Sequence, residues 1–335
     1  MRFLIGLSCV TVLLAGCALA QTPDSASNAG SAALSASSST SSPTPSTSSA
    51  ISTSTSTVSN ASAVHLTPDA NGAVPPEEIR ALLIRAEEKD LENDKQERNY
   101  TYIERQEEHR LDAGGKVEKT VIRTSEVLEI YGEQVEKLIA KDDKPLSAEE
   151  ARKEDEKIQK IIDKRKNESE DERRKRLEKE QKEREEDRKF VLEIADAFDF
   201  RLVGSELVNG RDTWVLEGRP HPGYKAKRKE AKLLDKFAGR VWIDKAEGQW
   251  VNLEMTALDT ISFGVFLARI HKGAHIVVDL VKVNDEVWLP SHVEFRMDAK
   301  LALVKTYRED VQQTFRDYKK FRTDSKITVL GESRE

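Results

Sequence analysis

Residues 200–217, FRLVGSELVNGRDTWVLE, carry the clearest structural signal in the chain. Two runs rich in apolar and β-branched residues flank Asn209-Gly210, and an Asn-Gly pair in that setting is the strongest short-range signal for a β-hairpin. Residues 240–243 and 250–255 flank a second turn, at 245–248, in the same way. The two hairpins predict a sheet whose neighbouring strands are antiparallel.

The strand pattern extends in both directions from these hairpins. Upstream, the turn residues 112–115 separate strands expected at 99–111 and 116–130. Downstream, turn residues occur at 272–273 and 284–285, and strands are expected at 260–270, 274–283, 286–290, 292–298, 301–307 and 315–322. Strands and helices do not alternate regularly, so we do not expect a parallel nucleotide-binding sheet.

Two amphipathic helices are expected beside the strands. The first begins at Pro75-Pro76, and its apolar stripe consists of Ile79, Leu82, Leu83 and Ala86. The second covers 225–237 and carries a basic cluster, formed by Lys225, Lys227, Arg228, Lys229 and Lys232. This cluster is either the solvated face of the helix or a surface that meets anionic head groups.

Residues 141–189 differ from the rest of the chain in composition. About three quarters of them are charged, in nearly equal numbers of both signs. Carboxylates and bases recur three and four residues apart, a spacing that stabilises a helix through ion pairs. The apolar residues of this segment do not form the continuous seam that a coiled coil requires. We predict a charged helical insertion that ends by packing the apolar residues of 190–198 onto the folded body. It is either a solvated helix or an arm that recruits a protein partner.

The first 20 residues have the features of an export signal peptide. Arg2 precedes an apolar run at 3–14, which is too short to span a membrane as a helix. Two cleavage patterns overlap. Ala18-Leu19-Ala20 fits ordinary cleavage before residue 21, whereas residues 14–17 resemble a bacterial lipobox, in which Cys17 is the site of lipid attachment. Both remain open, and the second predicts a lipoprotein anchored to the outer membrane.

Residues 21–63 consist almost entirely of Ser, Thr and Ala, a composition that predicts a disordered tether. Residues 64–330 then form one domain, which the insertion at 141–189 interrupts. Both cysteines, Cys9 and Cys17, lie in the signal, so the mature domain has neither a disulfide nor a cysteine ligand. The 54 basic and 60 acidic residues give a net charge of −6, which does not fit a nucleic-acid-binding protein.

We identify no catalytic or metal-binding residue in the sequence. It has no Gly-x-Ser-x-Gly elbow, phosphate-binding loop or His-Glu-x-x-His motif. His271 and His275 flank Gly273 at an expected turn, and we expect surface histidines there rather than metal ligands. The protein is therefore expected to be non-enzymatic and to need no cofactor. Ligand-binding residues remain unknown, because an error of one residue in register exchanges the two faces of a strand.

The hairpin motifs occur in an order that resembles a known family. The segments NGRDTWVL at 209–216, GRVWID at 239–244 and WVNLE at 250–254 are similar to those of the periplasmic lipoprotein-sorting and lipid-carrier proteins of the LolA/LolB type. The resemblance covers 190–320 and, more loosely, 76–131, but neither the charged insertion nor the tether. It implies an α+β fold, in which a curved antiparallel sheet forms a half-open barrel around helices.

The resemblance also implies a function. Proteins of this type hold acyl chains in an apolar concavity, so we expect an exported periplasmic protein that binds a lipid or the acyl chain of a lipoprotein and meets the membrane through its N-terminal anchor. Trp242 and Trp250 either line the concavity or pack within the sheet. The alternative is a structural or scaffold protein of the envelope, whose charged helix at 141–189 recruits a protein partner.

Overall fold

The computed structural model describes residues 65–131, 133–263, 268–301 and 305–321. The chain divides into two compact units, and every described residue belongs to the unit that includes Ala63–Glu335. The expected signal peptide at 1–20, Cys17 and the expected tether at 21–63 lie outside the described residues. Within the described ranges, no helix is both long and apolar enough to cross a membrane.

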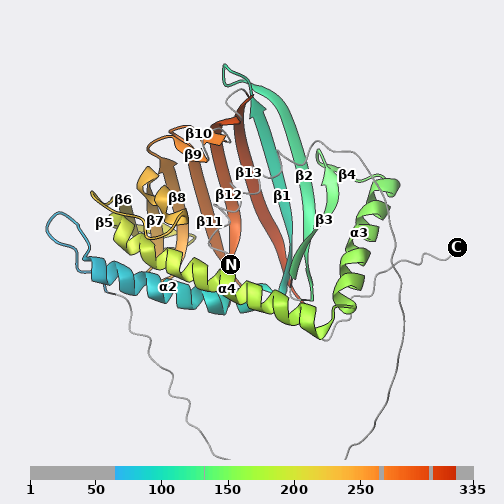
Figure 1. Ribbon diagram of the computed structural model, residues 1–335, viewed down its shortest axis with the longest axis horizontal. Helices are drawn as coiled ribbons and strands as arrows, with labels where there is room; N and C mark the ends of the chain where they lie inside the picture. Colours follow the sequence, from blue (N-terminus) through green and yellow to red (C-terminus); the bar gives the residue numbers. More distant parts are fainter. Residues whose placement is uncertain (1–64, 132, 264–267, 302–304, 322–335) are drawn as a thin grey trace, which may run out of the picture. The chain divides into compact units, whose positions relative to one another are not determined.

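One antiparallel sheet forms the base of this unit (Figure 1). Its hydrogen-bonded order is β4-β3-β2-β1-β13-β12-β11-β8-β7-β6-β5, with β10 beside β12 and β9 beside β10. The sheet ends at β4 and β5 and is not closed, so the expected α+β class with an open antiparallel sheet is confirmed. The strands are β1 Tyr100–Leu111, β2 Val117–Ile130, β3 Glu133–Lys141, β4 Lys144–Pro145, β5 Phe198–Val208, β6 Arg211–Pro220, β7 Phe237–Asp244, β8 Trp250–Ala257, β9 Ile261–Phe263, β10 Ala268–Ile270, β11 His275–Val283, β12 Val287–Leu301 and β13 Lys305–Lys320.

The hairpin predicted around Asn209-Gly210 is confirmed as the pair β5 and β6. Asn209 has φ +51° and Gly210 has φ +78°. Two successive positive φ angles are the geometry of the tight turn that joins twisted strands, and Asn and Gly tolerate it best. The second predicted hairpin, β7 and β8, turns through Gly248 at φ +72°. Local turn chemistry therefore places both hairpins correctly.

Several strand predictions need correction. The segments at 286–290 and 292–298 form one strand, β12, because a shift in register between Asp279 and Leu280 on β11 accommodates Pro290. Of the segments expected at 301–307 and 315–322, residues 305–307 and 315–320 likewise belong to one strand, β13, whereas Leu301 ends β12. The single strand expected at 260–270 is instead two short strands, β9 and β10, which pair with each other. Strand β3 was not predicted.

The charged insertion is not a single helix. Residue 141 ends β3, and two helices follow, α3 at Ala148–Lys166 and α4 at Glu170–Ala197. Ser147 with Glu150 and Ser169 with Glu172 form capping boxes, so each pair starts a helix of its own. The basic helix expected at 225–237 is also wrong, because the structure has a 3-10 helix, η1, that covers only Glu230–Lys236.

The predicted first helix is confirmed as α2, Pro76–Glu97, with prolines at its start. Figure 1 shows α2 and α4 side by side, and α2 packs against α4, β12 and β5. Arg188 of α4 pairs with Glu87 of α2 at 2.9 Å. Helix α3 packs against β3, where Ile158 is buried. The insertion is therefore charged and at the same time part of the packed unit.

Candidate functional site

One face of the sheet lies toward α2, and we call it the inner face. Gln134 of β3 donates a hydrogen bond from Nε2 to Oε1 of Glu97 in α2, at 3.1 Å. Side chains alternate between the faces of a strand, so Glu136 lies on the same face as Gln134. The register places Val127 of β2 opposite Glu136, and Tyr102 of β1 opposite Val127. These residues mark the inner face at the β3 side of the sheet.

The inner face is apolar where it crosses β8, β11 and β12. Residues from the three strands lie opposite one another in two adjacent rows, Leu253–Val278–Val293 and Met255–Ile276–Phe295. Val278, Val293 and Phe295 are buried, whereas Leu253 is half-buried. Burying an aliphatic or aromatic side chain stabilises a fold by roughly 1.5–3 kcal/mol. These rows therefore form part of the apolar core.

The same rows become polar as they continue onto β13 and β1. Val293 of β12 lies opposite Gln313 of β13, and Gln313 lies opposite Gln106 of β1. Gln106 shares a face of β1 with Glu104 and Tyr102, because these residues are spaced two apart. The inner face is thus divided into an apolar half and a polar half.

Carboxylates gather around Tyr102 in the polar half. We call Tyr102, Glu97, Glu104 and Glu136 the carboxylate cluster. Burial first, and then the charge of Glu136, raise the pKa of Glu104 to about 7. Burial and then the charges of Glu97, Glu104 and Glu136 raise the pKa of Tyr102. Because all of these charges are negative, the cluster disfavours any further ionisation.

Amide side chains contact the carboxylate cluster. Gln313 donates a hydrogen bond from Nε2 to Oε1 of Glu104 at 3.0 Å. The side chain of Tyr102 is more than nine-tenths buried, and its hydroxyl has no hydrogen bond to any described residue. Its ring lies 6.0 Å from that of Phe315 and 5.1 Å from that of Tyr318, centroid to centroid. The cluster therefore combines negative charge with aromatic rings.

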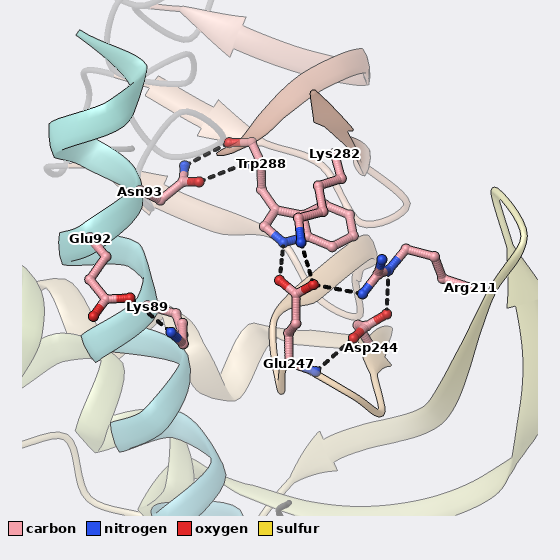
Figure 2. Close-up of polar contacts among 8 residues, drawn as sticks. All are labelled: Lys89, Glu92, Asn93, Arg211, Asp244, Glu247, Lys282 and Trp288. Carbon is pink, nitrogen blue, oxygen red and sulfur yellow. Dashed lines mark hydrogen bonds and ion pairs between the residues drawn. The ribbon is translucent and has the colours of Figure 1, made fainter. Parts of the chain in front are cut away.

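A second polar group lies where the β7–β8 turn meets β11 and β12, and we call it the Glu247 cluster (Figure 2). Glu247 accepts hydrogen bonds from Arg211 Nη2 at 2.7 Å, Lys282 Nζ at 2.5 Å and Trp288 Nε1 at 3.0 Å. Burial would raise the pKa of Glu247, but these partners outweigh it and lower that pKa. Asp244 accepts from Arg211 Nε at 2.6 Å. Every charge here faces an opposite charge.

The Glu247 cluster also adjoins the contact between α2 and the sheet. Asn93 of α2 donates from Nδ2 to the carbonyl of Trp288 at 2.6 Å, and its Oδ1 accepts from the Trp288 backbone N–H at 2.5 Å. The guanidinium of Arg211 lies 5.2 Å from the centroid of the Trp288 ring system. This region therefore joins α2, the β7–β8 turn and the start of β12, and we interpret it as a structural joint.

The structure decides between the alternatives for Trp242. Val241 lies opposite Leu253 and thus on the inner face, so its neighbour Trp242 lies on the opposite face. There Trp242 donates from Nε1 to Oε2 of Glu206 at 2.9 Å. Trp242 packs within the sheet and does not line the apolar half. Trp250 is buried as well.

The remaining residues that the sequence singled out do not form a site. Lys227 pairs with Asp196 at 2.7 Å, and Arg228 pairs with Glu186 at 2.9 Å. The basic cluster therefore partly contacts α4 rather than forming one face of a helix. His275 lies 3.0 Å from the hydroxyl of Thr256. In the described part of the chain, no group of three or more His, Cys, Asp and Glu side chains is placed to hold a metal ion.

The carboxylate cluster itself was not predicted. Its members come from α2, β1 and β3, and Gln313 comes from β13. Alternating Tyr102, Glu104 and Gln106 could have indicated a polar strand face. The pairing of β1 with β13, however, has no local signal in the sequence.

No protein-family model and no curated protein matches the chain. Solved structures do match it. A domain described as an outer membrane lipoprotein-sorting protein, from Vibrio parahaemolyticus, is 13% identical, with a TM-score of 0.30, and the match covers 74% of this chain and 95% of that one. A DUF1329 family protein from Desulfovibrio piger is 10% identical, with a TM-score of 0.26 and coverage of 75% and 95%.

A LolA superfamily protein from Nitrosomonas europaea is 9% identical, with a TM-score of 0.23, and the match covers 73% of this chain and 94% of that one. The lipoprotein-sorting domain and the LolA superfamily protein are of the kind that the hairpin motifs resemble. At such identities and TM-scores, the likeness concerns the fold and extends to no activity. The function of this chain must be inferred from its own residues.

Proposed function

We propose that this protein is a non-enzymatic envelope protein that binds a lipid or an acylated ligand on the inner face of its sheet. The observation that carries the proposal is the pair of apolar rows across β8, β11 and β12. An acyl chain laid along such rows gains about 0.8 kcal/mol for each CH₂ group removed from water. The antiparallel sheet suits this role, because its inner face is apolar where it crosses β8, β11 and β12.

An acyl chain can reach the apolar rows only if α2 or the side chains packed there move. Helix α2 touches β12 through the Asn93–Trp288 pair and packs on β5 near the edge of the sheet. The apolar rows between these contacts, which include Val278, Val293 and Phe295, must repack to admit a chain, and burial of the chain has to exceed that cost. We therefore expect binding to displace packed side chains of the apolar half while α2 stays joined to Trp288.

Two substitutions at neighbouring positions of β8 test the proposal. Leu253 lies on the inner face and Glu254 on the opposite face. We expect Leu253→Trp to fill the apolar half and weaken binding of a fluorescent fatty acid by about tenfold, the equivalent of 1.4 kcal/mol. Glu254→Trp is the matched control and should bind as the natural protein does. Equal binding by both variants, or no binding by the natural protein, would refute the proposal.

We also propose that the protein is exported and anchored through Cys17. The lipobox-like segment at 14–17 supports this, and several acyl chains on one residue would give stable membrane attachment. In a bacterial host, the natural chain should partition into the detergent phase, and Cys17→Ser should move it to the aqueous phase. If both forms stay aqueous, cleavage before residue 21 is the correct alternative.

A further inference from the structure

The two ends of the sheet differ in how their backbone groups are used (Figure 1). Near β3, side chains of α3 reach the backbone of the strand. The N–H of Leu138 donates to Oε2 of Glu154 at 3.4 Å, and the carbonyl of Glu136 accepts from Nζ of Lys157 at 3.4 Å. Such covering is common, because an open edge offers its N–H and C=O groups to any other strand. The edge at β5 is covered only in part.

The first part of the β5 edge already carries a short added strand. Ala73 forms an antiparallel bridge with Arg201, and the N–H of Leu202 donates to the carbonyl of Gly72 at 2.7 Å. Extended backbone that runs antiparallel to β5 therefore fits this edge.

Beyond Leu202, the outward backbone groups of β5 have no partner among the described residues. Val208 and Arg211 close the two-residue turn and form a hydrogen-bonded pair, and pairs of this kind alternate along a hairpin with pairs that are not hydrogen-bonded. The N–H and C=O groups of Ser205 and Leu207 therefore point away from β6. No hydrogen bond joins them to any residue that the structure describes. We call residues 203–208 the open edge.

Exposed apolar side chains accompany these backbone groups. Leu207 is 75% exposed, more than any other large apolar side chain in the described part of the chain, and Val203 is 45% exposed. The only charged residue of the open edge is Glu206, whose carboxylate accepts from Trp242 at 2.9 Å. Natural sheets often protect an edge with lysine or proline, and the open edge contains neither. It is therefore suited to pair with another strand.

We propose that the open edge binds an extended segment of a partner protein as an additional antiparallel strand. The direction follows from residues 72–74, since the added strand would continue their line along β5. In this mode of recognition, backbone hydrogen bonds provide affinity and alternate side chains provide specificity. A segment with apolar residues opposite Ser205 and Leu207 and a basic residue opposite Glu206 fits best. The inference goes beyond the proposed lipid binding and does not depend on it.

A second copy of this chain fits the open edge less well. A two-fold pairing centred on Ser205 would place Val208 of the second copy opposite Leu202, where Gly72 already lies. A separate extended segment meets no such obstacle, because it can end before it reaches Leu202. The geometry therefore favours a segment of another protein.

A blocked hexapeptide, valine-threonine-valine-lysine-valine-threonine, tests the inference on the full-length protein. Its third and fifth residues can lie opposite Leu207 and Ser205, with its lysine opposite Glu206, and isothermal titration measures its affinity. N-methylation of the third and fifth residues removes the N–H groups that face β5 and should weaken binding by about tenfold or more. N-methylation of the second and fourth residues removes N–H groups that face away and should leave the affinity unchanged.

Two substitutions in the open edge should each weaken binding of the hexapeptide by about tenfold. Leu207→Lys removes an apolar cross-strand contact. Ser205→Pro removes an outward N–H, and proline is tolerated where the N–H of an edge strand faces solvent. Leu177→Lys is the matched control, because Leu177 is 47% exposed but belongs to α4, and it should bind the hexapeptide as the natural protein does. None of the three variants should change the binding of the fluorescent fatty acid.

Three results would overturn the inference: no binding of the hexapeptide by the natural protein, equal binding of the two N-methylated peptides, or equal losses in Leu177→Lys and Leu207→Lys. Sedimentation velocity tests the other occupant. A dimer that forms with rising concentration and is lost in Ser205→Pro would show that a second copy covers the open edge, and the inference would be wrong. Fatty-acid binding is measured separately, so the proposed function stands or fails independently of these results.

Discussion

The Glu247 cluster and the carboxylate cluster each contain a partly buried glutamate, and the surroundings shift the pKa values of Glu247 and Glu104 in opposite directions. In the first, Glu247 and Asp244 face Arg211 and Lys282 at hydrogen-bonding distance, and the pKa of Glu247 is lowered. In the second, Glu104 has an amide as its hydrogen-bond partner, and its pKa rises to about 7. The two clusters respond in opposite ways because a buried charge stabilises a fold only when it is paired.

This difference separates carboxylates that pair with bases from Glu104, which accepts a hydrogen bond from an amide. The Glu247 cluster joins α2 to the strands around it, and its charges are already satisfied by the fold. In the carboxylate cluster, burial and the charge of Glu136 disfavour the ionised form of Glu104. Removing a charge should therefore weaken the fold at the first cluster and strengthen it at the second.

Asp244→Ala should have the largest effect on stability. Its carboxylate is 2% exposed, pairs with Arg211 and accepts the backbone N–H of Glu247 at 2.7 Å. The variant leaves Arg211 without this partner and frees the turn, so we expect a loss of about 3 kcal/mol in the free energy of unfolding, measured by urea denaturation.

Asp212→Ala is the control for that loss. Asp212 is 60% exposed and pairs with Lys245 at 3.0 Å. An exposed pair of this kind contributes about 0–1 kcal/mol. Equal losses in the two variants would mean that the Glu247 cluster is not a structural joint.

Glu104→Gln should stabilise the protein near pH 8. Folded Glu104 binds its proton up to about pH 7, whereas the ordinary pKa of a Glu is 4.5, so the folded state holds more protons between these values. The free energy of unfolding therefore falls as the pH rises through this window. Glutamine cannot ionise, and we expect a gain of about 2 kcal/mol above the window and none below it.

Thermal unfolding near pH 8 and near pH 4 checks this gain. Glu108→Gln, which removes a carboxylate already paired with Arg110, should give no gain at either pH. A loss of stability in Glu104→Gln near pH 8 would show that its charge is compensated and would make the two clusters alike.

The smallest effect is expected from a pair of tyrosines on β1. Tyr100→Phe removes hydrogen bonds to Glu286 and Asn284 and should cost about 1 kcal/mol. Tyr102→Phe removes a hydroxyl without a hydrogen-bond partner and should change the free energy of unfolding by less than about 0.5 kcal/mol. Both variants are measured by urea denaturation at one pH. A cost for Tyr102→Phe that equals the cost for Tyr100→Phe would mean that the Tyr102 hydroxyl is already satisfied.

Predictions from the sequence succeeded where the signal was local. Asn209-Gly210 forms the predicted turn because both residues tolerate positive φ angles, and Pro75-Pro76 opens α2 because proline suits the first turn of a helix. The prediction for 141–189 failed at the point where Ser169 starts a second helix, although that capping box was present in the sequence. The prediction for 225–237 failed at its start, where Lys227 and Arg228 contact α4 outside the 3-10 helix Glu230–Lys236.

By itself the sequence determined the class of the fold, the hairpin turns, the start of α2 and the charged nature of the insertion, because each depends on neighbouring residues. Only the tertiary structure decided which strands lie together and which side chains share a face. Gln313 and Glu104 are 209 residues apart and meet because β13 pairs with β1. A shift of one residue in that register would move Glu104 to the other face, so the carboxylate cluster exists only through the pairing of distant strands.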